Sequence, residues 1–375
     1  MLSEAIKEIT KKVSKSNDLI IYDPEREVES CSTGSLVLDS VTGKGGMLIR
    51  GRITELFGPE SSGKTTVALQ SVVEAQKKGW VGVFIDTEQT FDYNYASTLG
   101  ITLDDEDKFV VLQPNTYEET AAVLKIIYSK VKQLDYIILD SIAMTKPKDL
   151  ITGENKQLGQ HASSVQTLFM YLNNIFCKKF NTAVLAINQL RRSPNLSSPY
   201  QAKAMNDFSK GVGSGYSQDS TVTTTGGQAY RYIMSMRFML EPTKRHRDDE
   251  KNDLGNWVRC TAVKNKLAPP YTRAEFTITF GKGIDDFMSI VEKLKEAEYI
   301  YYQNPKWVLT DDNDTVVYGE KNQEDFLNTL KNSSKYYGFM KEVFNELIEE
   351  ERKGFNEDLD EDDLEVEEDE LEEFE

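Results

Sequence analysis

Short apolar runs alternate with stretches of helical periodicity between residues 53 and 187. Four of the runs have the length of buried strands, and they cover residues 53–57, 81–85, 136–139 and 182–187. Between them, apolar residues spaced three and four apart predict helices over residues 65–78, 117–132 and 160–179. Strands that alternate with helices build parallel sheets with helices on both faces. The pattern therefore predicts an α/β fold around a mostly parallel, twisted sheet.

The rest of the chain divides into segments of different character. Apolar residues at helical spacing predict an amphipathic helix inside an N-terminal segment, residues 1–30. The core is predicted over residues 31–283, with later strands at residues 234–240, 257–264 and 274–280. A small α/β C-terminal domain is expected over residues 284–353, with helices near residues 287–297 and 335–352. An acidic disordered tail is expected over residues 354–375.

The net charge of −18 is unevenly distributed. Residues 355–375 contain 14 Asp or Glu and no Lys or Arg. Removing these from the 62 acidic residues leaves 48 against 44 Lys and Arg, a net charge of about −4 for the rest of the chain. A nearly neutral body can carry basic surfaces, so nucleic acid is not excluded as a partner. The tail is interpreted either as a solubilising segment or as a competitor of DNA for such a surface.

Hydropathy, cysteine and histidine patterns exclude several other classes. No apolar run approaches the roughly 20 residues of a membrane helix, and the N-terminal pattern is not that of a secretory signal. The three cysteines lie far apart, which argues against a disulfide framework and favours the reducing cytoplasm. With only His161 and His246 available, a bound metal is expected to have oxygen ligands, as Mg²⁺ does.

The strongest motif follows the first predicted strand and precedes the first predicted helix. It comprises Gly58, Pro59, Glu60, Ser61, Ser62, Gly63, Lys64 and Thr65, with Thr66 directly after it. Its spacing matches the phosphate-binding P-loop. Glycines let backbone N–H groups approach phosphate oxygens, and the start of the next helix favours their negative charge. Lys64 is expected to bind the β- and γ-phosphates of ATP, and Thr65 to ligate Mg²⁺.

Polar residues end each of the other predicted strands. They are Asp86 and Glu88, Asp140, and Asn188 with Gln189. Ligands of open parallel sheets bind at the carboxyl ends of strands, so these side chains are expected near the P-loop. Asp140 is predicted to hold Mg²⁺ through water. Glu88 is the better candidate to activate the attacking water, with Asp86 as its competitor, and Gln189 is placed to sense the γ-phosphate.

Seven short motifs, taken together and in order, carry a resemblance to a known family. They are residues 32–36 (STGSL), 58–66 (GPESSGKTT), 84–88 (FIDTE), 139–141 (LDS), 188–191 (NQLR), 223–227 (TTTGG) and 263–266 (VKNK). On these residues the chain resembles the RecA strand-exchange recombinases, bacterial or phage-encoded, over roughly residues 30–285. The longer second loop and the acidic tail favour a phage member. A P-loop alone would indicate only a superfamily, whereas the ordered set is much more specific.

The resemblance implies roles for residues around the nucleotide. Glu88 corresponds to the family's catalytic base and Gln189 to its allosteric glutamine. Asp92 and Tyr95 correspond to residues beside the adenine, although Tyr95 is equally open to interpretation as a core residue. The cofactors implied are ATP and Mg²⁺.

Assembly is implied as well. Lys264 and Lys266 correspond to lysines that reach the ATP of the neighbouring subunit, and residues two apart on a strand face the same side. A solvated strand face is the plainer interpretation of the same pair. The family forms helical filaments on single-stranded DNA and pairs that strand with homologous duplex DNA. By resemblance the N-terminal helix docks on the adjacent protomer; packing on its own domain is the alternative.

Two polar stretches correspond to the family's DNA-binding loops. The first covers residues 152–161 and the second residues 191–225, which is longer than the usual family loop. Lysines, arginines and backbone N–H groups in such loops contact phosphates, and aromatic rings stack on bases. Phe208 is the aromatic residue chosen here, and a loop tip without DNA contacts is the alternative. The predicted DNA-binding residues are Gly153, Leu158, Gly159, Arg191, Arg192, Lys203, Phe208, Lys210, Thr225, Gly226 and Gly227.

The sequence thus predicts an ATP-dependent homologous recombinase of the cytoplasm, helped by single-strand-binding and loading proteins and independent of membranes. Two alternatives remain open at this stage. A ring-forming helicase would use the same core with an arginine finger, against which the Lys264 and Lys266 pair argues. A single-strand-coating or mediator protein with little ATP turnover is disfavoured by the complete set of Lys64, Thr65, Glu88 and Asp140.

Overall fold

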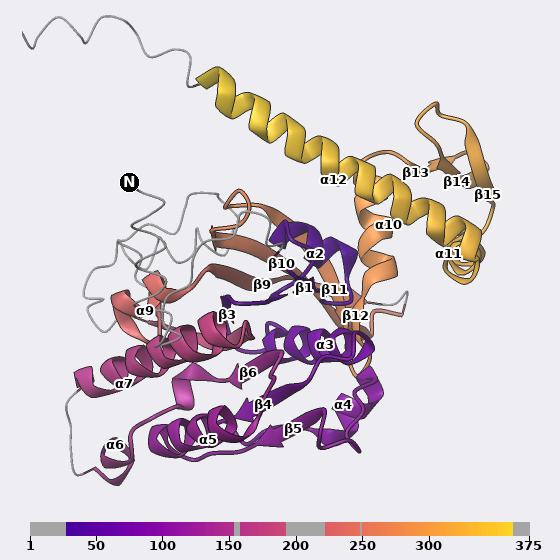
Figure 1. Cartoon of the computed structure of the whole chain (residues 1–375). Coiled ribbons are helices and arrows are strands. Elements are labelled where there is room, and N and C mark those ends of the chain that lie inside the picture. The colour runs from indigo at the N-terminus through magenta and orange to yellow at the C-terminus, as the bar shows by residue number, and fades with distance from the viewer. Residues whose placement is uncertain (1–27, 154–157, 193–221, 248–249, 363–375) are drawn as a thin grey trace, which may run out of the picture. The chain divides into compact units, whose positions relative to one another are not determined.

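The predicted strands lie at the centre of one large sheet (Figure 1). In the computed structural model, which describes residues 28–153, 158–192, 222–247 and 250–362, the strand order is β12-β11-β10-β9-β3-β7-β6-β4-β5. The parallel strands are β3 (Ile53–Gly58), β4 (Gly82–Asp86), β5 (Phe109–Leu112), β6 (Tyr136–Asp140), β7 (Ala183–Arg192) and β9 (Met236–Arg247). The predicted α/β class is confirmed; the strand β5 was not among the predicted ones.

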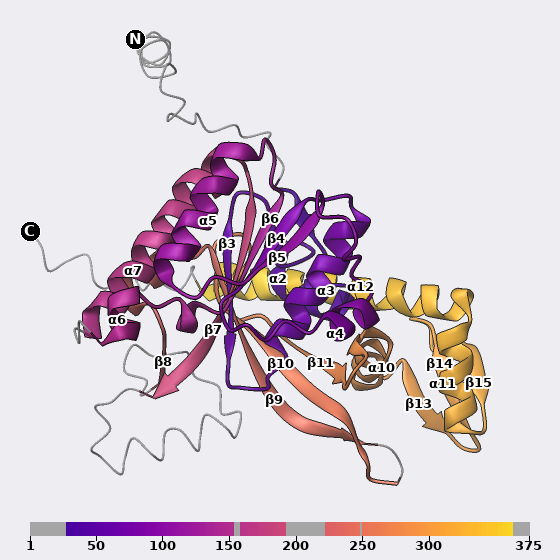
Figure 2. The same cartoon turned by 90° about the horizontal axis from the view of Figure 1, so that it is seen from below.

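Two helical layers cover this sheet because its buried strands are apolar on both faces. One face packs against α5 (Tyr117–Lys130), α7 (Leu158–Tyr171) and α9 (Gly227–Ile233) through Ile137, Leu139 and Val184. The other layer contains α2 (Leu36–Thr42), α3 (Lys64–Lys77) and α4 (Tyr93–Leu99). Figure 2 shows the two layers on opposite sides of the strands. The polar residues that follow the strands therefore meet only at the carboxyl edge of the sheet.

The helix predicted over residues 160–179 is two elements in the structure. Helix α7 ends at Tyr171 and continues as a π-helical segment, η3 (Leu172–Cys177). The wider turn keeps Leu172, Phe176 and Cys177 buried against the sheet. Short elements connect the strands on this side, namely η2 (Ile142–Met144) and α6 (Lys148–Thr152).

An antiparallel extension continues the sheet beyond β9. It contains β10 (Asp253–Asn265), β11 (Arg273–Thr279) and β12 (Gly283–Asp285), and β9 and β10 are longer than predicted. A separate two-stranded sheet joins β1 (Ser30–Cys31) to β2 (Leu48–Ile49). A further short strand, β8 (Val222–Thr224), pairs antiparallel with the end of β7. These elements belong to the first of two compact units, which ends at Asp285.

The second unit begins at Asp286 and has its own core. Its helices are α10 (Asp286–Glu296), α11 (Gln323–Asn332) and α12 (Ser334–Asp362). Its antiparallel sheet consists of β13 (Ile300–Gln303), β14 (Lys306–Thr310) and β15 (Val316–Glu320). Buried Leu294, Leu309, Phe326 and Phe344 hold these elements together.

Part of the segment predicted as an acidic tail is helical. Helix α12 extends to Asp362, through residues 354–362 that were predicted to be disordered. This stretch contains no proline, and Glu357, Leu359 and Glu361 favour helix, whereas its glycine, asparagine and aspartates do not. The predicted N-terminal helix within residues 1–17 and the tail beyond Asp362 lie outside the described residues. No helix in the described ranges is long and apolar enough to cross a membrane.

Candidate nucleotide site and the bases of the predicted DNA loops

The P-loop connects β3 to α3 and has the close-packed backbone that its glycines predict. Gly63 has φ of 85°, and a Cβ atom there would lie 2.1 Å from Cδ1 of Ile278. A Cβ atom on Gly58 would lie 2.2 Å from the carbonyl oxygen of Leu240. At Gly58 the neighbouring atom belongs to the backbone and only glycine fits, and at Gly63 the positive φ favours glycine. The loop is therefore shaped by its packing against β9 and β11, strands that come from a later part of the chain.

Lys64 is held in the mouth of this loop. Its side chain is buried, and Nζ donates to the carbonyl oxygens of Pro59 (2.6 Å) and Gly58 (3.3 Å) and to Ser62 Oγ (3.2 Å). Burial lowers the pKa of the ammonium group, while Asp140 and Glu88 oppose this effect. A poorly solvated cation on the inner side of the loop is suited to bind phosphate oxygens.

The predicted metal ligands are in contact. Thr65 Oγ1 donates to Asp140 Oδ2 across 2.7 Å. Burial raises the pKa of Asp140 to about 7, and the hydrogen bond from Thr65 opposes the rise. A hydroxyl oxygen and a carboxylate oxygen next to a phosphate-binding loop are hard ligands that suit Mg²⁺, which keeps several waters and phosphate oxygens in its shell. The donor set thus fits the predicted ion.

Glu88 and Gln189 meet on the same edge of the sheet. Gln189 Nε2 donates to Glu88 Oε1 across 2.9 Å, and Ser141 Oγ donates to the same oxygen. Asp86, the predicted competitor, is buried, and its Oδ2 accepts hydrogen bonds from the N–H of Phe91 and from Gln113. Asp86 therefore holds the loop after β4. Glu88 is only partly buried, so its carboxylate is the more accessible of the two.

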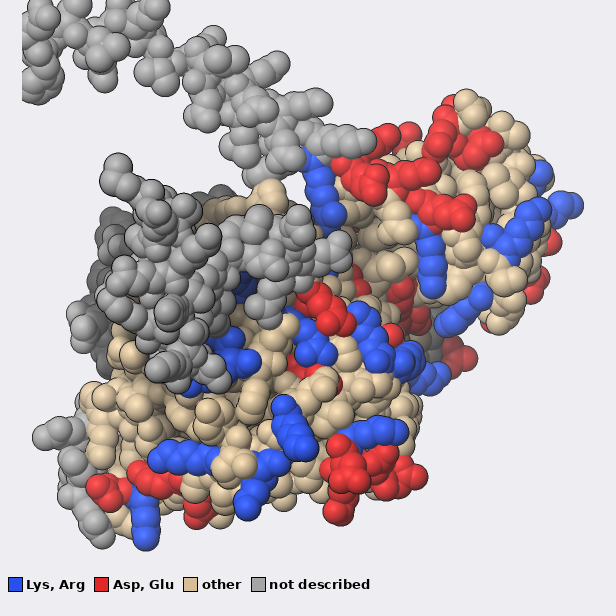
Figure 3. Space-filling view, viewed as in Figure 1, with Lys and Arg blue, Asp and Glu red and all other residues tan. Residues whose placement is uncertain are grey.

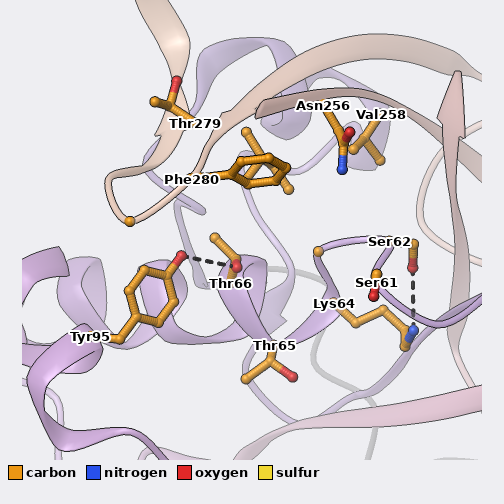
Figure 4. A pocket seen from close by; sticks show the side chains of 13 residues that line it. Ser61, Ser62, Lys64, Thr65, Thr66, Tyr95, Asn256, Val258, Thr279 and Phe280 are labelled. Atoms are coloured by element: carbon orange, nitrogen blue, oxygen red, sulfur yellow. Dashed lines mark hydrogen bonds between the residues drawn. The ribbon is translucent and has the colours of Figure 1, made fainter. Parts of the chain in front are cut away.

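A cavity of about 370 Å³ opens beside the P-loop (Figure 4). One wall is formed by Thr66 and Tyr95, whose hydroxyl groups lie 3.1 Å apart. The opposite wall was not predicted; it comes from β10, β11 and the turn after them, and consists of Asn256, Val258, Ile278, Thr279, Phe280 and Gly281. Phe280 was predicted to be the last residue of the strand over residues 274–280, and nothing in the sequence pointed to its place beside this cavity.

Asp92 does not line this cavity. It is the N-cap of α4, where its Oδ1 accepts hydrogen bonds from the N–H groups of Asn94 (2.8 Å) and Tyr95 (3.0 Å). The structure thus places Asp92 behind Tyr95, as a residue that fixes the start of its helix.

The two predicted lysines lie at the far end of β10. Lys264 Nζ donates to the carbonyl oxygen of Arg231 across 2.7 Å, and neither Lys264 nor Lys266 lines the cavity. Burial lowers the pKa of Lys264 to about 8, with the charges of Lys266 and Arg237 adding to the shift. Strand β10 ends at Asn265, so Lys266 lies beyond it, and the alternation of faces assumed from the sequence does not extend to this pair.

The ends of both predicted DNA loops are more regular than expected. Gly153 ends α6 with φ of 78°, whereas Leu158 and Gly159 belong to the first turn of α7. Arg191 and Arg192 extend β7 and pair with Thr223 and Val222 of β8. After β8 come Thr225, Gly226 and Gly227, of which Gly226 has φ of 109° and precedes α9. Lys203, Phe208 and Lys210 lie outside the described residues.

Both signs of charge are present on the surface of the first unit. On the face in Figure 3, Lys and Arg side chains lie among neutral and acidic residues of the first unit, and acidic side chains also gather along α12. The first unit therefore offers basic groups despite the acidic total of the chain.

A P-loop at the carboxyl end of a parallel strand, with a hydroxyl, a carboxylate and a second glutamate beside it, defines the class of P-loop nucleotide-binding proteins. The family model of the RecA N-terminal domain matches residues 1–197 and 201–285. Protein RecA of a Nitratiruptor species is 38% identical over 304 residues, covering 80% of this chain and 78% of the relative. Protein RecA of Helicobacter pylori is 35% identical over 315 residues, covering 81% and 83%.

The chain belongs to the RecA family. Its function is that of an ATP-dependent homologous recombinase in DNA recombination and repair, and the helicase and mediator alternatives are not favoured. The relatives named above are bacterial proteins, so the expectation of a phage-encoded member is not borne out.

Proposed function

We propose that this chain binds ATP and Mg²⁺ between adjoining protomers, assembles on single-stranded DNA as a helical filament, and couples ATP hydrolysis to strand exchange with homologous duplex DNA. The observation that carries the proposal is the meeting of Lys64, Thr65, Asp140, Glu88 and Gln189 at one edge of the sheet. These residues come from four strand ends, and chance would not bring this combination together beside a P-loop.

The phosphate chemistry follows from the positions of these groups. Thr65 and, through water, Asp140 would hold Mg²⁺, which would neutralise charge on the β- and γ-phosphates of ATP. Lys64 binds the same phosphates with its buried ammonium group. Glu88, held at Oε1 by Gln189 and Ser141, orients and deprotonates the attacking water through its other oxygen. Tyr95 and Phe280 enclose the base in the neighbouring cavity.

Assembly supplies the remaining contacts. Lys264 and Lys266 do not line the nucleotide cavity of their own chain, which supports a role at the ATP of a neighbouring protomer, similar to an arginine finger supplied in trans. A head-to-tail contact of this kind repeats without closing and produces a filament. The segments after α6 and β7 contact the DNA backbone, and base pairing supplies sequence recognition.

Strand exchange between circular single-stranded DNA and homologous linear duplex DNA tests the proposal. Joint molecules are expected only with ATP and Mg²⁺, and Lys64→Ala is expected to abolish both joint molecules and ATP turnover. Directional unwinding of a forked duplex would favour a helicase, and DNA coating without turnover would favour a mediator. Joint molecules at the wild-type level from Lys64→Ala would refute the proposed mechanism. A cytoplasmic setting with single-strand-binding and loading partners accompanies this function.

A further inference from the structure

A buried ion pair lies behind the nucleotide site. Glu55 of β3 and Arg237 of β9 are 0% and 4% exposed, and Arg237 Nε donates to Glu55 Oε2. Removing two charges from water costs free energy that their mutual attraction recovers only when the other donors and acceptors are also satisfied. Here the second oxygen of Glu55 and a further nitrogen of Arg237 bind Asn188 and Thr224, which adjoin the candidate nucleotide site and the second predicted DNA loop. This distinguishes the pair from one that only fills the core.

Asn188 connects this pair to the residue that holds Glu88. Its Nδ2 donates to Glu55 Oε1 (2.7 Å) and to the carbonyl oxygen of Thr225 (2.9 Å). Its Oδ1 accepts from the N–H of Gln189 (2.9 Å), whose side chain in turn donates to Glu88. Since Asn188 is fully buried, no water replaces a contact that is lost.

Arg237 connects the pair to the strand that returns from the second predicted DNA loop. Its Nη2 donates to Thr224 Oγ1 across 3.1 Å, and Thr224 is 2% exposed. Thr224 is also the residue of β8 that pairs with Leu190, directly after Gln189. The side-chain hydroxyl of Thr224 and the backbone carbonyl of Thr225 are thus bound by two side chains, Arg237 of β9 and Asn188 of β7.

We propose that Glu55, Arg237 and Asn188 form a positioning network that links the place of Thr224 and Thr225 to the orientation of Gln189 and Glu88. In a buried network the hydrogen bonds depend on one another, so a movement of one residue changes the positions of the residues bound to it. A shift of β8 changes the contact with Asn188, and with it the backbone of Gln189. The inference rests on the proposed function, in which DNA binds the segment that ends at β8.

The first test removes one hydrogen bond with little change of shape. Thr224→Val deletes the acceptor of Arg237, and Thr54→Val is the matched control. Thr54 is a buried threonine of β3, next to Glu55, and its hydroxyl donates only to the carbonyl oxygen of Met47 among the named groups (2.9 Å). Both variants are expected to lose similar thermal stability. Only Thr224→Val is expected to lower the ratio of DNA-stimulated to basal ATP hydrolysis, by roughly fivefold or more.

The second test replaces the ion pair. In Glu55→Met/Arg237→Met both charges are removed, so neither is left buried alone, and unbranched apolar side chains occupy the space. The double variant is expected to keep basal ATP hydrolysis and lose stimulation by single-stranded DNA. If it does not fold, as judged by circular dichroism, Thr224→Val alone decides. Wild-type stimulation ratios in Thr224→Val, or in a folded double variant, would overturn the inference.

Hydrogen exchange separates this inference from the proposed function. Binding of a non-hydrolysable ATP analogue in the absence of DNA is expected to change amide exchange in Val222–Thr224 of the wild type and of Thr54→Val, and much less in Thr224→Val. Absence of DNA-stimulated hydrolysis in the wild type would refute the proposed function alone. An exchange response that is equal in the wild type and in Thr224→Val would refute the network alone.

Discussion

The phosphate end and the base end of the candidate site are built in different ways. At the phosphate end, Lys64, Asp140 and Gln189 are held by partly buried hydrogen bonds of 2.6–2.9 Å. At the base end, Phe280 is 50% exposed, and Tyr95 has one hydroxyl contact to Thr66. Groups that perform chemistry must be held in place, whereas a cavity wall needs only shape and apolar surface. The two ends should therefore respond differently to substitution.

The largest effect is expected from Glu88→Gln at the phosphate end. Loss of the general base should lower kcat about 10²–10⁴-fold while ATP binding is retained. Single-turnover hydrolysis with single-stranded DNA, together with equilibrium binding of a fluorescent ATP analogue, measures both quantities. Glu106→Gln, at an exposed position, serves as the control. Hydrolysis by Glu88→Gln at a tenth of the wild-type rate or faster would assign the base elsewhere.

Asp140→Asn should have the next largest effect. Asparagine has the shape of aspartate and can still accept the hydrogen bond from Thr65, but it carries no charge. The affinity for Mg²⁺ in the presence of ATP should therefore fall about 10–100-fold. Titration of hydrolysis with Mg²⁺ measures the change. Thr65→Ser retains the hydroxyl and should keep the wild-type Mg²⁺ dependence. Equal Mg²⁺ dependence in Asp140→Asn and the wild type would remove Asp140 from the metal site.

Phe280→Ala tests the base end. Aromatic stacking contributes roughly 0.5–1.5 kcal/mol, so the Kd for ATP should rise about two- to tenfold. Tripolyphosphate lacks the base, and its affinity should stay unchanged, which is the sharpest contrast between the two ends. Phe280→Tyr keeps the ring and should bind ATP as the wild type does. A similar loss of affinity for tripolyphosphate would show that Phe280 shapes the P-loop and not the base cavity.

The smallest effect is expected from the titration of Lys264, near the C-terminal end of β10. The pKa of Lys264 is lowered to about 8, so the folded chain releases this proton near pH 8, whereas the unfolded chain keeps it up to about pH 10.5. Between these values the unfolded state binds more protons, and this group's contribution to folding stability rises with pH. The charge available to a neighbour's phosphates falls over the same range.

Sedimentation of the ATP-bound protein between pH 7 and 9 measures how self-association depends on the charge of Lys264. Self-association should weaken by a few fold above pH 8 in the wild type, since a lysine loses its charge there. Lys264→Arg stays charged throughout and should show a flat profile. A decline of the same size in Lys264→Arg would place the titrating group elsewhere.

The amino-acid sequence was sufficient for the contiguous part of the site. Residues 58–65 form the P-loop by themselves because glycine spacing, a preceding apolar strand and a following helix are local properties. The residues after the strands were also predictable, because parallel strands end at one edge. Thus Glu88, Asp140 and Gln189 were named before their contacts were known.

Only the tertiary structure decided contacts between distant segments. The burial of Asp86, whose Oδ2 accepts from Phe91 and Gln113, could not be read from the sequence, and it supports Glu88 as the proposed base. The wall formed by Asn256 and Phe280 depends on the packing of the antiparallel extension against the P-loop. The Glu55 network joins residues up to 182 positions apart. Side-chain periodicity reports which face of an element is buried, but the neighbour on that face is set by strand order, which no local pattern encodes.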